Sequence, residues 1–144
     1  MRRFGAPPVH GISYTNRPGA YGIIRRGRDL LITHQSEPFN EFQLPGGGID
    51  AGENATTALH REAFEETGWT ITIERKLGAF MFFTYMPEYD LHARKVCHIF
   101  ECRAVIQKSE PLEPGHTAFW MPPETAATQI YNPGDRAFVR ALCL

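Results

Sequence analysis

The stretch from Gly47 to Trp69, GGIDAGENATTALHREAFEETGW, carries the strongest structural signal in the chain. Its second half places one arginine and three glutamates within six residues. Asn54 is a residue type that caps the start of a helix, and Gly68 is the type that ends one. The sequence therefore predicts a helix over residues 55–67, with an unusual concentration of acidic side chains.

Two of these glutamates fall on the side of the helix that also carries its small and apolar residues. Counted at about 100° per residue from the first helical position, Glu62 lies at about 340°, Glu66 at about 20° and Leu59 at about 40°. A solvated face of ion pairs, such as Arg61 with Glu65, does not predict two like charges four residues apart there. A divalent cation would offset their repulsion, and oxygen ligands favour a hard ion, Mg²⁺ or alternatively Mn²⁺.

The residues before this helix add to the same chemistry. Gly46, Gly47 and Gly48 predict a flexible loop that can offer backbone groups to a metal or a phosphate. Glu53 stands at the helix entry, where it can reach Arg61 or a metal-bound water. Carboxylates, a glycine loop and a divalent ion together suit phosphate ester chemistry, in which the metal neutralises phosphate oxygens and activates water.

The whole run from Gly47 to Trp69 resembles the Nudix box of the Nudix (MutT-like) hydrolases, G-x5-E-x7-R-E-U-x-E-E-x-G-U, where U is a bulky apolar residue. Every charged and glycine position of the pattern is filled, by Gly47, Glu53, Arg61, Glu62, Glu65, Glu66 and Gly68. At the two apolar positions, Ala63 is smaller and Trp69 is larger than usual. Neither departure touches the chemistry, and a match of this length is far more specific than a short glycine motif.

The resemblance implies a fold, a reaction and a set of site residues. The fold is an α/β/α sandwich around a mixed central sheet, and the reaction is hydrolysis of a nucleoside diphosphate linked to another moiety by water attack on phosphorus. The usual metal ligands of the family match the carbonyl of Gly46 and the side chains of Glu62, Glu65 and Glu66. The pair that braces the helix and tunes the site matches Glu53 and Arg61.

The general base varies within the family, so its identity stays open. Glu62 on the helix is one candidate. The others lie in the segment 110–124, and they are Glu113, His116 and Glu124.

The sequence on either side of the box predicts further strands and two C-terminal helices. Before the box, we expect an irregular arm over 1–19 and strands over 21–25, 29–34 and 41–44. After it, we expect two strands within 70–85 interrupted near 76–78, further strands over 95–105 and 117–121, and helices over 123–130 and 135–144. This order is neither a strict βα alternation nor all-β, so it predicts an α/β fold with a mixed sheet. No linker divides the chain, so we expect a single Nudix domain over residues 1–144.

Charge and length narrow the expected partners. A chain of 144 residues suits one domain, and a net charge of −1 does not indicate binding to a nucleic acid polymer. The first 28 residues nevertheless carry six arginines and no acidic residue. They form either a basic tail with a solvated turn or a positive rim that attracts a phosphorylated small molecule.

Cysteine usage and hydropathy favour a soluble cytoplasmic protein. The three cysteines show no zinc-site spacing, and Cys97 and Cys102 are expected on opposite faces of one strand. The N-terminus lacks the apolar region of a signal peptide, and no apolar run approaches the ~20 residues of a membrane span. We therefore expect no membrane association.

The leaving group is less well determined than the pyrophosphate chemistry. Tyr85 lies 16 residues past Trp69, roughly where family members acting on dinucleoside polyphosphates carry a tyrosine, although a core or sheet-surface role is the alternative. Phe39 and Phe119 line a base pocket or pack in the core. The expected substrate is a nucleoside triphosphate or a dinucleoside polyphosphate. A Nudix-fold module that binds a nucleotide without cleaving it remains the alternative, and a homodimer remains open.

Overall fold

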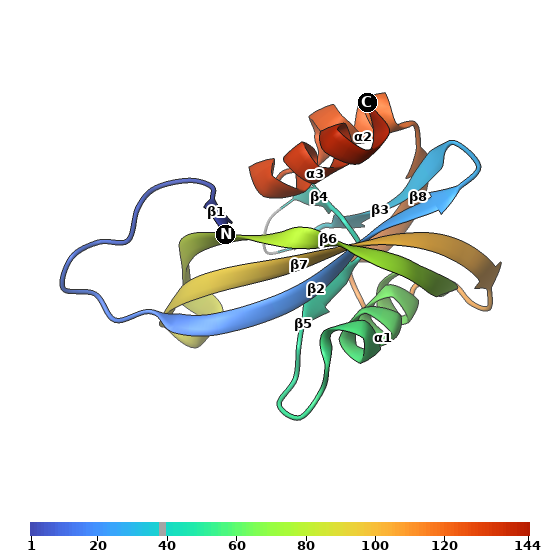
Figure 1. Cartoon of the computed structure of the whole chain (residues 1–144). Helices are drawn as coiled ribbons and strands as arrows, with labels where there is room; N and C mark the ends of the chain where they lie inside the picture. Colours follow the sequence, from blue (N-terminus) through green and yellow to red (C-terminus); the bar gives the residue numbers. More distant parts are fainter. Residues whose placement is uncertain (38–39) are drawn as a thin grey trace.

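A twisted mixed sheet forms the middle layer of the protein, seen in a computed structural model that describes residues 1–37 and 40–144 (Figure 1). Its strands are β1 (Arg2–Arg3), β2 (Thr15–Arg26), β3 (Asp29–Gln35), β4 (Glu41–Gln43), β5 (Gly46–Gly48), β6 (Trp69–Met86), β7 (Leu91–Gln107) and β8 (His116–Met121). The helices are α1 (Ala55–Thr67), α2 (Pro123–Gln129) and α3 (Pro133–Cys143), with a 3-10 turn at Pro87–Tyr89.

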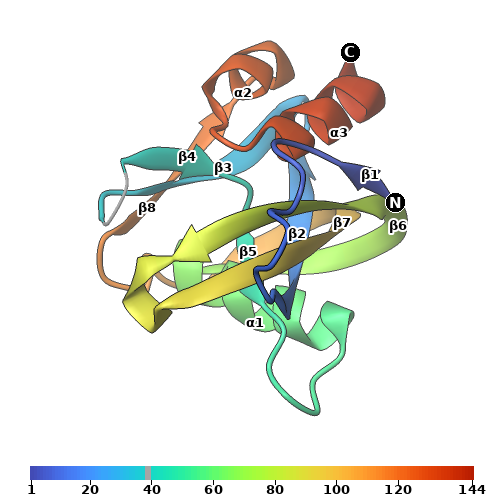
Figure 2. The same ribbon diagram turned by 90° about the vertical axis from the view of Figure 1, so that its left-hand side faces the viewer.

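The sheet combines parallel and antiparallel pairings. The strand order is β1-β6-β7-β2-β3-β4, with β5 paired to β2 and β8 paired to β3. β2 runs parallel to β7, whereas β6 runs antiparallel to it. Helix α1 lies against one side of the sheet, and α2 and α3 lie against the other (Figures 1 and 2). The predicted α/β/α sandwich with a mixed central sheet is confirmed.

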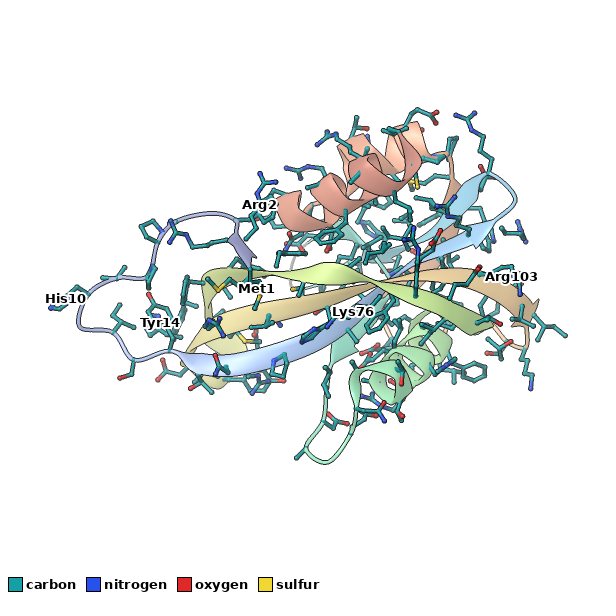
Figure 3. The ribbon with its side chains drawn as sticks, viewed as in Figure 1. Met1, Arg2, His10, Tyr14, Lys76 and Arg103 are labelled. Carbon is teal, nitrogen blue, oxygen red and sulfur yellow. The ribbon has the colours of Figure 1, made fainter. Side chains whose placement is uncertain are left out.

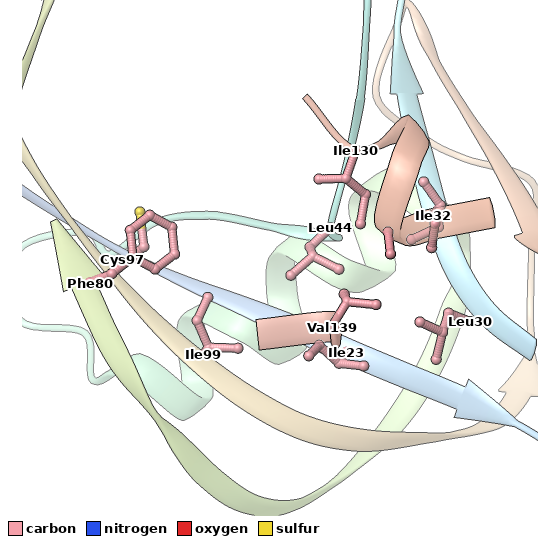
Figure 4. Packing of buried hydrophobic residues seen from close by; sticks show 11 residues of the cluster. Ile23, Leu30, Ile32, Leu44, Phe80, Cys97, Ile99, Ile130 and Val139 are labelled. Atoms are coloured by element: carbon pink, nitrogen blue, oxygen red, sulfur yellow. The ribbon is translucent and has the colours of Figure 1, made fainter. Parts of the chain in front are cut away.

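Each side of the sheet has its own hydrophobic core. The cluster under α2 and α3 includes Ile23, Leu30, Ile99 and Val139, whose side chains point toward one another in Figure 4. The cluster under α1 includes Leu59, Ala63, Ile71 and Phe100. Cys97 belongs to the first cluster and Cys102 to the second, so the two thiols lie on opposite faces of β7 as predicted. All three cysteines are free.

Helix α1 begins and ends where the sequence predicts. The Asn54 side chain accepts a hydrogen bond of 2.8 Å from the backbone N–H of Thr57. At the other end, Gly68 adopts a left-handed conformation with φ 76° and donates its N–H to the Phe64 carbonyl. A side chain at this position would also clash, because a Cβ on Gly68 would lie 1.8 Å from the carbonyl oxygen of Ser109. The helix therefore stops at a residue that must be glycine.

The glycine run at the start of the box is a strand, and the prediction of a flexible loop over Gly46–Gly48 is wrong. These residues form β5, which pairs antiparallel with Gly19–Tyr21 of β2. The pairing partner lies more than twenty residues earlier in the chain, so local propensity gives no sign of it. Strand β5 is therefore held in place by β2, beside α1.

Two other boundaries differ from the prediction. The region 70–85 is one continuous strand, because register shifts at Lys76/Gly78 and two earlier points absorb the expected interruption. The irregular arm is shorter than residues 1–19, since β2 begins at Thr15 and β1 pairs with β6 near the chain start. Figure 3 shows His10 and Tyr14 on the part of the arm that leaves the sheet.

The C-terminal helices follow the prediction with small shifts. Helix α3 begins at Pro133 instead of residue 135, because the Asn132 side chain caps it by accepting from the N–H of Gly134 at 2.8 Å. Phe39, an expected base-pocket residue, lies outside the described residues, and Phe119 is exposed beside Phe42. Within the described part of the chain, none of the helices has both the length and the apolarity needed to cross a membrane.

Candidate active site

Glu66 is the most buried carboxylate of the acidic helix. Only 6% of the residue is exposed, and its Oε1 accepts a 2.9 Å hydrogen bond from the N–H of Gly46 in β5. Its Oε2 lies 3.4 Å from Nε2 of His116 in β8. Burial raises the pKa of Glu66, while the contacts with His116 and Gly46 act in the opposite direction. The helix, β5 and β8 therefore meet at this carboxylate.

Glu62 packs one turn earlier against the glycine strand. A Cβ on Gly47 would lie 2.6 Å from the carboxyl carbon of Glu62, so a larger residue there would displace this carboxylate. Burial and the charge of Glu66 raise the pKa of Glu62 to about 7, although the Arg61 guanidinium opposes the shift. The two carboxylates thus repel each other in the arrangement that the helical spacing predicted.

Arg61 connects the helix to the segment that precedes it. Its guanidinium donates two 2.9 Å hydrogen bonds to the carboxylate of Glu53 and one of 2.9 Å to Glu62. It also donates to the Gly48 carbonyl at 3.2 Å. The hydrogen bonds from Arg61 and from the N–H of Asp50 lower the pKa of Glu53 to about 2. Glu53 and Arg61, which were expected to brace the helix, are therefore in direct contact.

The loop over residues 108–115 brings a further acid to the helix. The carbonyl of Glu65 accepts hydrogen bonds from the N–H groups of Leu112 and Glu113, at 2.8 and 3.0 Å. The carboxylate of Glu113 consequently faces those of α1. Glu65 itself is the outermost of the three helix carboxylates, with 42% of its side chain exposed.

Two groups of ligand atoms in this region are close enough to share an ion. One oxygen from each of Glu62, Glu65 and Glu113 lies within 4.8 Å of the others, and so do one ligand atom each from Glu66, Glu113 and His116. Glu113 belongs to both groups. Among the residues that the structure describes, its buried Oε2 and the buried Nδ1 of His116 have no hydrogen-bond partner, and these two atoms lie 3.9 Å apart. Unsatisfied polar atoms in an oxygen-rich cluster fit a hard divalent cation such as Mg²⁺.

The candidates for the general base lie in different places. Glu62, Glu113 and His116 line one cavity. The contact with Glu66 raises the pKa of His116. Glu124 lies elsewhere: its exposed carboxylate is ion-paired with Arg28 and is not part of the cavity wall.

The cavity has a volume of about 990 Å³ and extends from these carboxylates along β6 and β7 to the start of α3. β5 contributes Gly46, Gly47 and Gly48 to its wall. Tyr85 lies at the mouth, 46% exposed, and its hydroxyl donates to the carboxylate of Asp90. Tyr85 is therefore a surface residue of the sheet that also borders the cavity.

Several cavity residues were not predicted as site residues. Asp135, in the first turn of α3, is buried, and its Oδ1 has no hydrogen-bond partner within residues 1–37 and 40–144. Burial raises its pKa to about 7. Lys95 of β7 and Tyr21 of β2 also line the wall. No local motif surrounds these residues, and only the packing of distant strands brings them to one cavity.

The early arginines do not form one rim around this cavity. Arg25 forms an ion pair with Glu101 at 2.8 Å, and Arg26 lies 4.2 Å above the ring of Trp120. Arg17 differs from them, because it lies over Tyr89, a residue of the cavity wall. The arginines of the first 28 residues thus lie on several different surfaces of the protein.

The sheet between two helical layers, with an acidic helix held against a glycine strand, defines a Nudix-type domain. The NUDIX domain profile matches residues 15–142 of this chain. The chain therefore belongs to the Nudix hydrolase family, as the resemblance indicated.

Individual relatives share about a third of their residues with this chain over the matched segments. The chain is 29% identical over 113 residues to the 8-oxo-(d)GTP phosphatase of Mycolicibacterium smegmatis, covering 78% of this chain and 33% of that protein. It is 34% identical over 82 residues to the RNA pyrophosphohydrolase of Agrobacterium fabrum, covering 56% of this chain and 48% of that protein. These matches span less than half the length of either relative.

A solved structure shows the same fold. The MutT protein from Methanosarcina mazei Go1 superposes with a TM-score of 0.71 at 19% sequence identity, covering 91% of this chain and 95% of that one. At this level of identity the likeness concerns the fold.

Proposed function

We propose that the protein is a divalent-metal-dependent hydrolase that cleaves a pyrophosphate bond in a nucleoside diphosphate linked to another moiety. The observation that carries this proposal is the convergence of the α1 carboxylates and Glu113 at one end of a cavity large enough for a nucleotide. The names of the two relatives, a phosphatase acting on 8-oxo-(d)GTP and an RNA pyrophosphohydrolase, support the same reaction class.

In this proposal, Mg²⁺ or alternatively Mn²⁺ is held by the Gly46 carbonyl and by the carboxylates of Glu62, Glu65 and Glu66, and Glu113 is an added ligand. When bound, such an ion neutralises phosphate oxygens and lowers the pKa of a water molecule. Hydrogen bonds from Arg61 fix the carboxylate of Glu62, and Glu53 fixes Arg61 in turn. This chain of contacts holds the ligand cluster in place before substrate arrives.

The proton of the attacking water passes to a side chain at the same end of the cavity. Glu62 suits this role because its pKa is raised to about 7. Glu113 suits it because its buried Oε2 accepts no hydrogen bond from any described residue, and His116 lies beside it. We propose that the base is one of these three and that Glu124, ion-paired with Arg28, is a surface residue.

The substrate is proposed to be a small nucleotide, a nucleoside triphosphate or a dinucleoside polyphosphate, with Tyr85 and β5 at the wall that receives it. We also propose that residues 1–144 act as one Nudix domain without a nucleic acid polymer or a membrane as partner. The alternative, a module that binds a nucleotide without cleaving it, is disfavoured because every charged position of the box is filled.

Activity measurements on matched variants test the proposal. Loss of a side chain that only supports a metal ligand costs about 10–100-fold in activity, so Glu65→Gln and Glu66→Gln should each lose about 100-fold or more. Glu74→Gln, an exposed glutamate on β6, should behave as wild type. The substrate panel should include canonical and oxidised nucleoside triphosphates, diadenosine polyphosphates, ADP-ribose, NADH and a 5′-triphosphorylated RNA oligonucleotide.

The outcomes separate the two functions. Activity that requires Mg²⁺ and disappears in both glutamine variants supports the hydrolase. Equal activity in wild type and both variants would rule out the assigned metal ligands. Nucleotide binding without turnover of any compound would favour the binding module.

A further inference from the structure

One end of the cavity has a cationic side chain in its wall that the proposed chemistry does not use. Lys95 of β7 lines the cavity, and its Cα pairs with that of Arg17 in the neighbouring parallel strand β2. Paired residues of adjacent strands point to the same face of a sheet. The Arg17 guanidinium lies 4.9 Å from the centre of the Tyr89 ring, which is also part of the cavity wall. Two cations therefore lie side by side here.

This end is well separated from the acidic cluster. Gly46, whose N–H holds Glu66, is paired with Tyr21 of β2. Tyr21 lies four residues along β2 from Arg17, and four residues of a strand span roughly 13 Å. A group bound at Lys95 is thus remote from a diphosphate bound at the carboxylates.

The position of Lys95 in the cavity wall disfavours the charged form of its side chain. Its ammonium forms no ion pair within the described part of the chain. Burial lowers its pKa, and the charge of Arg17 lowers it further. Cys97 and Glu88, which also line the cavity, act in the opposite direction. The Cys97 thiol stays neutral because burial raises its pKa to about 12, and the carboxylate of Glu88 lies beyond ion-pair distance. A desolvated lysine beside a second cation is stabilised when an anion binds between them.

From this arrangement we propose that Lys95 and Arg17 form a second anion-binding subsite, which accepts a phosphate group that the substrate carries beyond the hydrolysed diphosphate. That the bound phosphate belongs to a substrate rests on the proposed hydrolase function. The binding of an anion by Lys95 and Arg17 does not depend on that function. Its ligand is a phosphate monoester on the leaving group or the terminal phosphate of a longer polyphosphate chain.

Calorimetric titration with inorganic phosphate, in EDTA so that no metal recruits the anion, tests the subsite directly. Wild type and Lys95→Arg should bind phosphate, whereas Lys95→Met should bind at least about tenfold more weakly, as expected for loss of one charge-assisted hydrogen bond. Arg17→Gln should also weaken binding. Lys108→Met and Arg103→Gln, which remove exposed charges outside the cavity, serve as matched controls and should bind as wild type.

Matched nucleotides then identify the source of the phosphate. Coenzyme A and dephospho-coenzyme A differ by one phosphate monoester, and adenosine tetraphosphate and triphosphate differ by one phosphate in the chain. A preference for the phosphorylated member of either pair that disappears in Lys95→Met supports the subsite and names its ligand.

Equal phosphate affinity in wild type and Lys95→Met, or no phosphate binding by wild type, would overturn the proposal. None of these titrations requires turnover. A chain that binds phosphate through Lys95 but hydrolyses nothing would contradict the hydrolase function alone, and an active enzyme without Lys95-dependent binding would contradict the subsite alone.

Discussion

Arg61 joins three parts of the candidate site. One guanidinium contacts the carboxylates of Glu53 and Glu62 and the carbonyl of Gly48. These partners belong to the helix entry, the helix and β5. A planar fork with several donors can satisfy them at once, whereas a single ammonium cannot.

Replacing Arg61 by lysine should therefore impair catalysis while keeping the charge. We expect Arg61→Lys to lower kcat by about 10–100-fold, because Glu62 loses the contact that orients it. Steady-state kinetics on the best substrate would measure the effect. The control is Arg103→Lys, because Arg103 is an exposed arginine of β7 (Figure 3). An unchanged kcat in Arg61→Lys would contradict the bracing role.

Asp135 should make stability depend on pH. Burial raises its pKa from 3.8 to about 7, so the native state keeps this proton over a range in which the unfolded chain has released it. The native state then holds more protons, and its contribution to stability is present below the unfolded pKa and falls as pH rises through the native one. A shift of this size corresponds to at most about 4 kcal/mol.

We expect Asp135→Asn to flatten this dependence, since an amide does not titrate. Thermal unfolding at about pH 5 and about pH 8 should show a smaller loss of Tm in the variant than in wild type. Asp29→Asn, a carboxylate outside the cavity wall, should leave the dependence unchanged. Identical pH dependence in wild type and Asp135→Asn would show that the carboxyl is ionised in the native state.

At the scale of elements, the end of α1 is joined to the loop over residues 108–115. Gly68 ends the helix, and its carbonyl accepts the N–H of Lys108 at 2.9 Å. The carbonyl of Glu65 holds the other end of the same loop. The position of Glu113 therefore depends on how the helix ends.

A pair of glycine substitutions tests this dependence. Gly52 and Gly68 have nearly the same left-handed φ, 79° and 76°, but only Gly68 faces a neighbour that a Cβ would strike. We expect Gly52→Ala to cost about 1–2 kcal/mol from backbone strain alone. Gly68→Ala should cost more and should also lower activity by displacing the loop. Chemical denaturation and kinetics would show this, and equal effects of the two substitutions would contradict it.

The sequence predicts the elements whose signals are local. Asn54 and Gly68 mark both ends of α1 correctly, because caps act within one turn. β5 was missed because three glycines form a strand only through pairing with β2. The continuity of β6 was missed because bulges near Gly78 keep the pairing with β7 through a residue that usually interrupts strands.

At the scale of the whole molecule, the sequence likewise predicts only those cavity residues that belong to a local motif. The sequence predicts that Glu62, Glu65 and Glu66 lie together because all three belong to one helix. Lys95 and Asp135 come from β7 and α3, and their meeting depends on the order in which strands assemble. The sequence thus predicts the acidic end of the cavity, and only the structure reveals the rest of its wall.

The N-terminal arm is fastened to the molecule mainly near its start. Phe4 donates its N–H to the carbonyl of Met81 at 2.9 Å and packs edge-on against Phe80 of the core, with ring centres 5.4 Å apart. A smaller cavity of about 220 Å³ is lined partly by Phe4 and Tyr131. The arm therefore completes one side of the molecule beside α3.

Phe4→Ala should release this arm without unfolding the sheet. We expect a loss of stability of about 1–3 kcal/mol, less than for a fully buried phenylalanine, and faster amide exchange in β1 and along its partner strand β6. Hydrogen-exchange mass spectrometry would measure both. Val9→Ala, at an exposed position of the arm, should change neither, and unchanged exchange in Phe4→Ala would contradict this role.

The attachment of the loop over residues 108–115 has a consequence for how such a protein can diversify. The loop is tied to the acidic helix through the main chain of Glu65, so the tie does not depend on which side chain that residue carries. Loops that differ in composition but keep a carboxylate at position 113 can be grafted onto the same two amide contacts while the helix keeps its surface. Laboratory variation of the other residues in this segment can therefore leave the box untouched.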